Sequence, residues 1–350
     1  MGDLIEIRAA CSPGEMRIAV IDHDVLLDAA LWRPGIPDGF EDRHVVRVQT
    51  VAPALGGAFV LLAGGESGFL STRQPLVQGA LAGAQVTRSA QNGKGLRLRP
   101  VTLPLDGVMG PILLERGPSP LEELADRYPD SPIFVDDPGM AARLPSRLRS
   151  RLRRCQQAFD GALEADFEAL ESPEADLGLL TASIFPTPAL VAIDLDSSGN
   201  PDFKGNVASF PELARQIRLR NLSGTLLVDP AGVKTRKRPA LAGFLQDALK
   251  DDPLTPQVLG ATPSGLLELT RPRRRPPLHE LLSSLHGKAL SLLRQILREN
   301  RPGRTLTASI PLARALESDP LALEDFMSRR AAPIEIVLNP DAPPASWSLS

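Results

Sequence analysis

Cysteine is nearly absent from this sequence, which holds only Cys11 and Cys155 in 350 residues. Two thiols this far apart cannot build a disulfide framework or a cysteine-rich zinc cluster within one chain. We therefore expect both to be ordinary buried or exposed thiols.

Long apolar runs are also missing. No stretch approaches the roughly 18 uninterrupted apolar residues that a membrane helix needs. The first residues, Met1-Gly2-Asp3-Leu4, lack the basic segment and apolar run of a secretion signal. We expect a cytoplasmic protein with no membrane contact. The hydrophobic content of 43% is still sufficient for two or three small domains with a core each.

The chain has no excess of positive charge, because its formal net charge is -3. It cannot coat nucleic acid by bulk attraction, so any RNA contact must be local. Aromatic residues make up only 4% of the chain, so any surface for base stacking must be small. The cations that are present cluster in three runs, which are residues 147–154, 234–238 and 271–275. Each run could simply be a solvated surface.

The first half of the chain alternates strand and helix patterns. Residues 16–31 predict a β-hairpin around an Asp-His-Asp turn, and residues 44–102 hold several short strands with Gly-rich turns, which favours a small barrel. Mixed α/β material follows from 104 to 182, with a helix over 120–128 and another over 163–170.

The centre of the chain has a strand, helix, strand pattern. Residues 189–194 and 224–229 are apolar strands, and a helix ends at 213–220 between them. Near-continuous apolar strands indicate burial on both faces, and a crossover helix permits parallel pairing. The Pro-Arg-rich stretch 271–277 predicts a linker, and a helix over 278–298 precedes strands near Leu306 and Ile334.

Asp194 and Asp229 each end one of these central strands. Ligands and catalytic groups gather at the carboxyl ends of strands in α/β sheets. Two carboxylates brought together repel each other unless a cation lies between them, and Mg²⁺ often binds through one or two carboxylates plus phosphate. An Asp at the end of a strand can also serve as a cap or turn residue.

Several stretches around these aspartates resemble one family. They are Val191-Ala192-Ile193-Asp194-Leu195-Asp196-Ser197, residues 213–224, Leu227-Val228-Asp229, and Gly265-Leu266-Leu267-Glu268-Leu269-Thr270-Arg271. Their order and approximate spacing resemble the catalytic domain of ribonuclease E/G proteins. The Ala-Arg-Gln-x-Arg-Leu-Arg stretch that begins at Ala214 is the most specific part.

The resemblance implies an α/β (α+β multidomain) fold. It implies a DNase-I-like catalytic domain, an OB-type RNA-binding barrel inserted near the N-terminus and a small C-terminal α/β domain. The expected boundaries are 1–42 and 104–182 for a reduced RNase-H-like region, 43–103 for the barrel, 183–277 for the catalytic domain, and 278–350 for the last domain.

The resemblance also implies roles for single residues. Asp194 and Asp229 correspond to the metal-binding aspartates, and Asp196 occupies a supporting catalytic position that is usually Asn. In the barrel, Phe59 and Phe69 are expected to stack on bases and Lys94 to meet a phosphate, although Phe59 can instead be a core residue. The run that follows Asp229 adds four expected RNA contacts, which are Lys234, Arg236, Lys237 and Arg238.

Some family features are absent. Pro-Arg-rich sequence replaces the Cys-Pro-x-x-Cys zinc link after Arg271, so a homo-oligomer, if formed, is expected not to be zinc-linked. The pocket that senses a five-prime monophosphate has no counterpart. Ala208 replaces a common carboxylate, and the segment between Ser197 and Asn206 is short.

These observations lead to a first hypothesis of a magnesium-dependent endoribonuclease that cleaves single-stranded RNA by attack of metal-activated water, in RNA processing or decay. The alternative is a catalytically quiet relative that binds RNA. A metal-dependent phosphatase or a nuclease with another substrate is a third reading, which the barrel disfavours.

Overall fold

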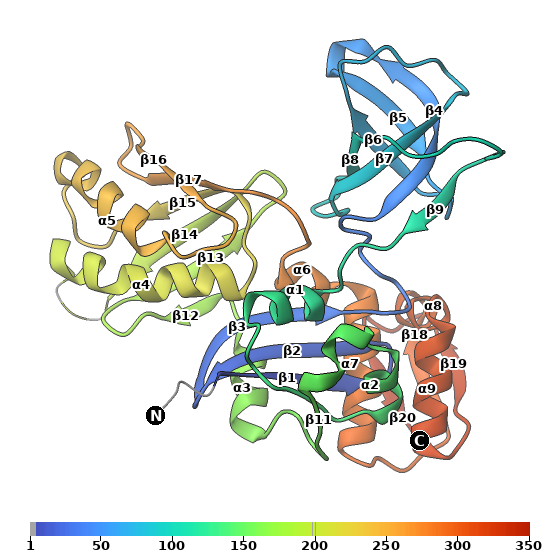
Figure 1. Ribbon diagram of the computed structural model, residues 1–350. Coiled ribbons are helices and arrows are strands. Elements are labelled where there is room, and N and C mark those ends of the chain that lie inside the picture. Colours follow the sequence, from blue (N-terminus) through green and yellow to red (C-terminus); the bar gives the residue numbers. More distant parts are fainter. Residues whose placement is uncertain (1–4, 198, 200) are drawn as a thin grey trace. The chain divides into compact units, whose positions relative to one another are not determined.

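The protein is described by a computed structural model that covers residues 5–197, 199 and 201–350. It divides into two compact units built from separate stretches of sequence (Figure 1). The first unit takes in the chain up to Pro37 together with Ser119–Ser172 and Leu278–Ser350. The second unit consists of Asp38–Pro118 and Pro173–Pro277.

The first unit contains a five-stranded sheet in the order β11-β10-β1-β2-β3. Its predicted hairpin is present, and His23 in the turn has a φ of 53°. The helix predicted over 120–128 is also present, because Ser119 and Glu122 form a reciprocal capping box at its start. The elements are β1 (Ile5–Ser12), β2 (Glu15–Asp22), β3 (Val25–Trp32), α1 (Pro120–Arg127), β10 (Ile133–Val135), α2 (Pro138–Arg143), η2 (Ser146–Arg151), β11 (Leu152–Arg154) and α3 (Gly161–Ala169).

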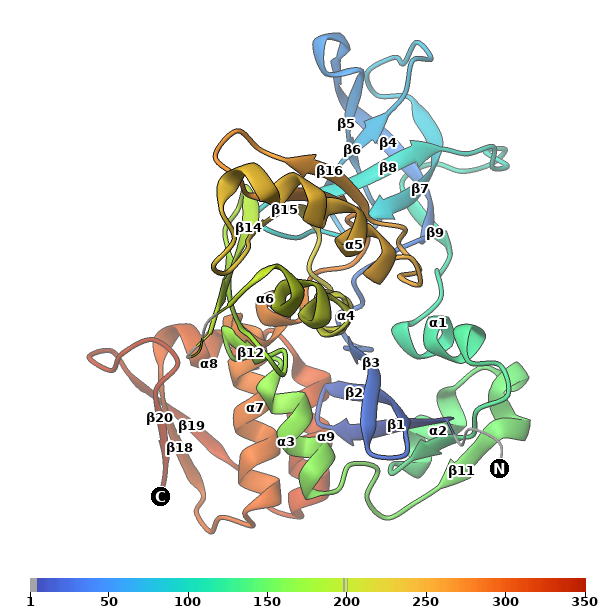
Figure 2. The same ribbon diagram turned by 90° about the vertical axis from the view of Figure 1, so that its left-hand side faces the viewer.

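The same unit holds a three-stranded sheet in the order β19-β18-β20, which shares a core with three helices (Figure 2). The single helix predicted over 278–298 was wrong, because Ser284 interrupts it and caps a second helix through Gly287 N. The elements are α6 (Leu278–Ser283), α7 (Leu285–Arg298), β18 (Thr305–Ser309), α8 (Ile310–Glu317), α9 (Pro320–Arg330), β19 (Glu335–Asn339) and β20 (Trp347–Leu349).

The barrel predicted from the sequence is present in the second unit. Its strands follow the order β5-β6-β8-β7-β4, and pairing of β5 with β4 closes the ring, while β9 pairs outside it with β4. Val46, Val60, Leu70 and Leu98 are among the side chains that fill its interior. The elements are β4 (Arg43–Ala52), η1 (Pro53–Leu55), β5 (Gly57–Leu61), β6 (Ser67–Ser71), β7 (Leu81–Arg88), β8 (Leu96–Pro100) and β9 (Ile112–Glu115).

The rest of the second unit is a six-stranded mixed sheet in the order β12-β13-β14-β15-β17-β16. The parallel pair predicted from the sequence is its centre, where β14 and β15 are joined by the crossover helix α4. The elements are β12 (Glu174–Asp176), β13 (Thr181–Pro186), β14 (Leu190–Asp196), α4 (Phe203–Leu219), β15 (Gly224–Asp229), η3 (Thr235–Ala240), α5 (Leu241–Ala248), β16 (Gln257–Ala261) and β17 (Leu267–Arg271).

The prediction that the central strands are buried on both faces was wrong. Val191, Ile193 and Leu195 of β14 are buried in one core with residues of α4 and α5. The alternate residues Asp194 and Asp196 are exposed, since side chains of a strand point to opposite faces in turn. The sheet therefore has one face covered by helices and one free face.

Candidate active site

Asp194 and Asp229 lie directly opposite each other on neighbouring parallel strands. The pairing register of β14 and β15 ends with these two residues, so both side chains project from the free face of the sheet. Apolar residues on either side of each Asp anchor the strands in the core. The local fold thus brings together the two carboxylates that the sequence singled out.

The charge of this site is strongly negative. The pKa of Asp194 is raised by partial burial of its carboxyl group and by the negative charges of Asp229 and Asp196. Asp196 lies two residues further along β14 on the same face. A cation at this point would relieve the repulsion among the three carboxylates.

Arg238 supplies a positive charge at this site, because it forms an ion pair with Asp229. Its guanidinium donates to Asp229 Oδ1 at 2.6 Å and to the carbonyl oxygens of Val233, Pro230 and Gly265. The Arg238 side chain is only 17% exposed. Arg238 therefore fixes the loop that follows Asp229, and its expected contact with RNA stays a prediction.

Asn206 is a positioning residue that the sequence reading missed. It is fully buried in α4, and its side-chain amide donates to Ala231 O at 2.8 Å and accepts from Ala231 N at 3.1 Å. Ala231 lies two residues after Asp229, so Asn206 ties the start of the crossover helix to the loop that follows Asp229. The sequence did hold a signal for this role, because Asn206 is a polar residue on the same helix as the core residues Phe210 and Leu213.

The other cations of this run lie on the surface. Lys234, Arg236 and Lys237 are all exposed at the start of η3, within nine residues of Asp229. They form no ion pair in the described part of the chain. Their charged groups are therefore open to solvent.

Within residues 5–197, 199 and 201–350, no group of three or more His, Cys, Asp or Glu side chains is arranged to hold a metal ion. Asp194 and Asp229 alone would be the protein ligands. Such a pair fits Mg²⁺, which keeps several waters and binds through one or two carboxylates plus phosphate. It fits neither structural zinc, which takes four N or S ligands, nor a closed calcium site.

The barrel brings Phe59 and Phe69 together on its outer surface. They are register partners on β5 and β6, with ring centroids 5.3 Å apart in an edge-to-face arrangement. Phe59 is 42% exposed, so it is not a core residue. Lys94 is exposed at the tip of the turn between β7 and β8, outside this aromatic row. Arg97 of β8 instead lies over Phe69, at 5.5 Å from the ring centroid.

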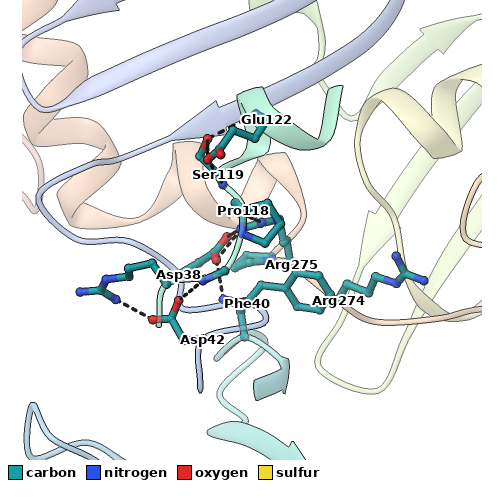
Figure 3. Close-up of polar contacts among 12 residues, drawn as sticks. Asp38, Phe40, Asp42, Pro118, Ser119, Glu122, Arg274 and Arg275 are labelled. Carbon is teal, nitrogen blue, oxygen red and sulfur yellow. Dashed lines mark hydrogen bonds and ion pairs between the residues drawn. The ribbon is translucent and has the colours of Figure 1, made fainter. Parts of the chain in front are cut away.

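The run 271–275 is partly structural. Arg271 ends β17 and forms a buried ion pair with Asp252 at 2.8 Å. Arg275 donates to both oxygens of Asp38 and to Pro118 O, and it lies 5.0 Å from the ring centroid of Phe40 (Figure 3). The predicted linker is thus held to the base of the barrel, where the barrel strands enter and leave.

Residues 180–274 match the ribonuclease E/G family. Among named relatives, Ribonuclease E of Nostoc sp. is 34% identical over 107 residues, which are 28% of this chain and 16% of that protein. Ribonuclease E of Escherichia coli is 28% identical over 183 residues, covering 44% and 17% of the two chains. Ribonuclease G of Salmonella typhimurium is 30% identical over 115 residues, covering 29% and 24%.

The matched part of the chain spans between a sixth and a quarter of the length of these relatives. Among the described residues, no helix is long and apolar enough to cross a membrane. The matched segment contains β14, α4, β15 and β17, and with them both aspartates and Arg238. Through this segment, the chain is similar to the ribonuclease E/G family.

Proposed function

We propose that this protein is a magnesium-dependent endoribonuclease that cleaves single-stranded RNA in RNA processing or decay. The observation that carries the proposal is the register pairing of Asp194 with Asp229 at the carboxyl ends of two parallel strands. The relatives named Ribonuclease E and Ribonuclease G support the same reaction class. In this proposal the six-stranded sheet is the DNase-I-like catalytic domain.

When bound, Mg²⁺ would supply an activated water and neutralise negative charge on the phosphodiester. Asp194 and Asp229 would hold the ion, and Asp196 would add negative charge beside them. Arg238 and Asn206 would act as positioning residues, because both fix the loop of residues 229–233. Lys234, Arg236 and Lys237 would attract the scissile strand to an otherwise acidic surface.

The barrel would bind the RNA strand through the bases of the RNA. Every base has a flat face that can stack on Phe59 or Phe69, so this contact tolerates many sequences. Bases within a duplex cannot reach aromatic side chains in this way. The barrel therefore favours single-stranded RNA as the substrate.

One specific observation favours the second candidate, a catalytically quiet RNA-binding protein. Arg238 occupies one oxygen of Asp229, and that ion pair partly neutralises a carboxylate needed for the metal. In this case the barrel would retain its role, while the aspartates would serve only the structure of the site.

An end-labelled single strand incubated with the purified protein distinguishes the two candidates. With Mg²⁺ we expect shortened labelled products, and with EDTA or with Asp194→Asn we expect none. Asp194→Asn keeps the shape of the side chain and removes its charge, so its fold is checked by circular dichroism. Products of equal yield with and without Mg²⁺, or from Asp194→Asn, would contradict the magnesium mechanism.

A further inference from the structure

Two arginines of the barrel extend the aromatic row. Arg97 on β8 is the register partner of Phe69 on β6, and it is also paired with Arg88 across β7 and β8. The row along the outer surface therefore runs Phe59, Phe69, Arg97, Arg88. Arg88 donates to Gly95 O at 2.7 Å, and Arg97 donates to Ser71 Oγ at 2.9 Å.

A third arginine is brought to this row by the segment that leaves β17. Ser89 N donates to Arg274 O at 2.8 Å, and Gln91 Nε2 donates to the same carbonyl oxygen at 3.3 Å. This backbone hydrogen bond brings Arg273, which precedes Arg274, near Arg88, which precedes Ser89. Burial lowers the pKa of Arg88, and the positive charges of Arg97 and Arg273 add to this effect, so both groups lie within electrostatic range of Arg88.

These three arginines have no acidic partner in the described part of the chain. Their hydrogen bonds go to neutral oxygens only, and Arg273 has a single long one, to Ala189 O at 3.4 Å. The Nε atoms of Arg88 and Arg273 are buried without any acceptor. The neighbouring Arg271, Arg275 and Arg238, by contrast, each pair with an Asp.

Buried donors without an acceptor are costly, and clustered like charges add to the cost. An anion with several oxygens among the three groups would reduce the repulsion and supply acceptors for their donors. Guanidinium groups suit phosphate oxygens in particular, because their donors form a planar fork.

We propose that Arg88, Arg97 and Arg273 form a binding site for a backbone phosphate of the single-stranded RNA whose bases stack on Phe59 and Phe69. This inference rests on RNA as the ligand in the proposed function. Because Arg97 contacts the Phe69 ring, one strand can use the stacking surface and the phosphate site together. Recognition at such a site depends on the backbone and is independent of base sequence.

Binding of a fluorescent single strand, measured by anisotropy in EDTA over a series of salt concentrations, tests the inference without cleavage. The test variant is Arg88→Gln/Arg273→Gln. We expect about a tenfold loss of affinity, the scale of one charge-assisted contact, and a salt slope reduced by roughly 0.7, the value for one phosphate on a single strand.

The control is Arg43→Gln, which removes one positive charge from the barrel by the same type of substitution. Arg43 is paired with Glu115 at 3.1 Å, so this change should leave affinity and slope nearly as in the wild type. Arg88→Lys/Arg273→Lys keeps the charges but loses the forks, and it should restore the slope with only part of the affinity. Thermal melting of each variant checks that it is folded.

The outcomes separate this inference from the proposed function. Arginine-dependent binding without any cleavage would support the phosphate site and overturn the endoribonuclease. Normal cleavage with wild-type binding by the double Gln variant would overturn the phosphate site alone. An equal loss of affinity in the Arg43→Gln control would also overturn it, since the effect would then be net charge. A dependence seen only with a five-prime phosphorylated strand would replace the backbone phosphate with a terminal one and so contradict the proposal.

Discussion

Two sheet surfaces of the second unit lack a covering layer of helices, and their chemistry is opposite. The outer surface of the barrel carries Phe59, Phe69 and the arginines beside them. The free face of the six-stranded sheet carries Asp194, Asp196 and Asp229. A cationic aromatic surface can hold a phosphodiester strand unaided, whereas an acidic surface repels it unless a cation is present. In the proposed function, holding RNA and cutting it are therefore separate tasks within one unit.

The largest expected effect is on the rate of RNA cleavage, without a change in RNA affinity. Asp229→Asn should reduce magnesium-dependent cleavage by about a thousandfold or more, because a metal ligand contributes several kcal/mol to the reaction barrier. Its affinity for single-stranded RNA in EDTA should stay unchanged. Single-turnover cleavage and anisotropy measure the two quantities.

The control for this prediction is Asp196→Asn, which introduces the residue that the family usually has at this position. Its cleavage should persist, because the aspartate pair remains. A similar loss of cleavage in both variants would mean that the acidic surface acts as a whole and that no specific pair exists.

The second prediction concerns the segment that runs from the sheet to the barrel. Arg271→Ala leaves Asp252 buried without its partner, and breaking a buried pair in this way costs about 3–5 kcal/mol. The free energy of unfolding in urea should fall by this amount. Arg274→Ala, at an exposed neighbouring position, should change it by less than about 0.5 kcal/mol. Equal effects of the two changes would show that the ion pair adds nothing to stability.

The third prediction concerns the affinity for single-stranded RNA. Phe69→Ala should weaken binding of single-stranded RNA by about 1–3 kcal/mol, the usual contribution of one stacked base. Phe185→Ala is the matched control, because Phe185 is 54% exposed on the free face of the other sheet. Its affinity should match the wild type, and duplex RNA should bind poorly to all three proteins. An equal loss for both Phe variants would remove the distinction between the two surfaces.

The smallest expected effect distinguishes the two regions by pH. His44 lies buried in β4 of the barrel, and burial lowers its pKa below the ordinary value of 6.5. The nearby Asp42 and Glu66 oppose this shift, while Arg116 adds to it. Protonation therefore costs more in the folded than in the unfolded protein. The contribution of His44 to stability is complete above pH 6.5 and declines as the pH falls towards the folded-state pKa.

Unfolding in urea at pH 7.5 and pH 5.5 measures this contribution, with the two values chosen about one unit either side of the ordinary pKa of His. The loss of stability at the lower pH should be smaller in His44→Asn than in the wild type. His44 is the one histidine of the second unit. If His44→Asn showed the same pH dependence of stability as the wild type, His44 would be excluded as the cause.

The strand, helix, strand centre could be predicted from the sequence because two apolar runs flank an amphipathic helix. The free face could not, since Ala192 and Leu227 are apolar residues that point to it and conceal the alternation of buried and exposed positions. The break at Ser284 was hidden for a similar reason, because leucines continue on both sides of it.

The roles of the arginines were beyond prediction from the runs themselves. Arg238, Arg271 and Arg275 are paired with aspartates 9, 19 and 237 residues away. A run of cations does not reveal such partners, because tertiary structure sets them. The phosphate site that we infer comes from the arginines that remain after these pairs are assigned.

The placement of the barrel within the sequence has a consequence for synthesis. The barrel is one continuous stretch, so its strands can pair while the ribosome is still making later residues. Strand β1 remains at the edge of its sheet until β10, its parallel partner, has been made, because their pairing joins Ile7 to Ile133. At translation rates of ~5–20 residues per second, this edge stays open for on the order of ten seconds. A nascent chain with an unpaired strand edge is exposed to aggregation, so the barrel inserted between the two strands lengthens the time for which the chain depends on chaperones.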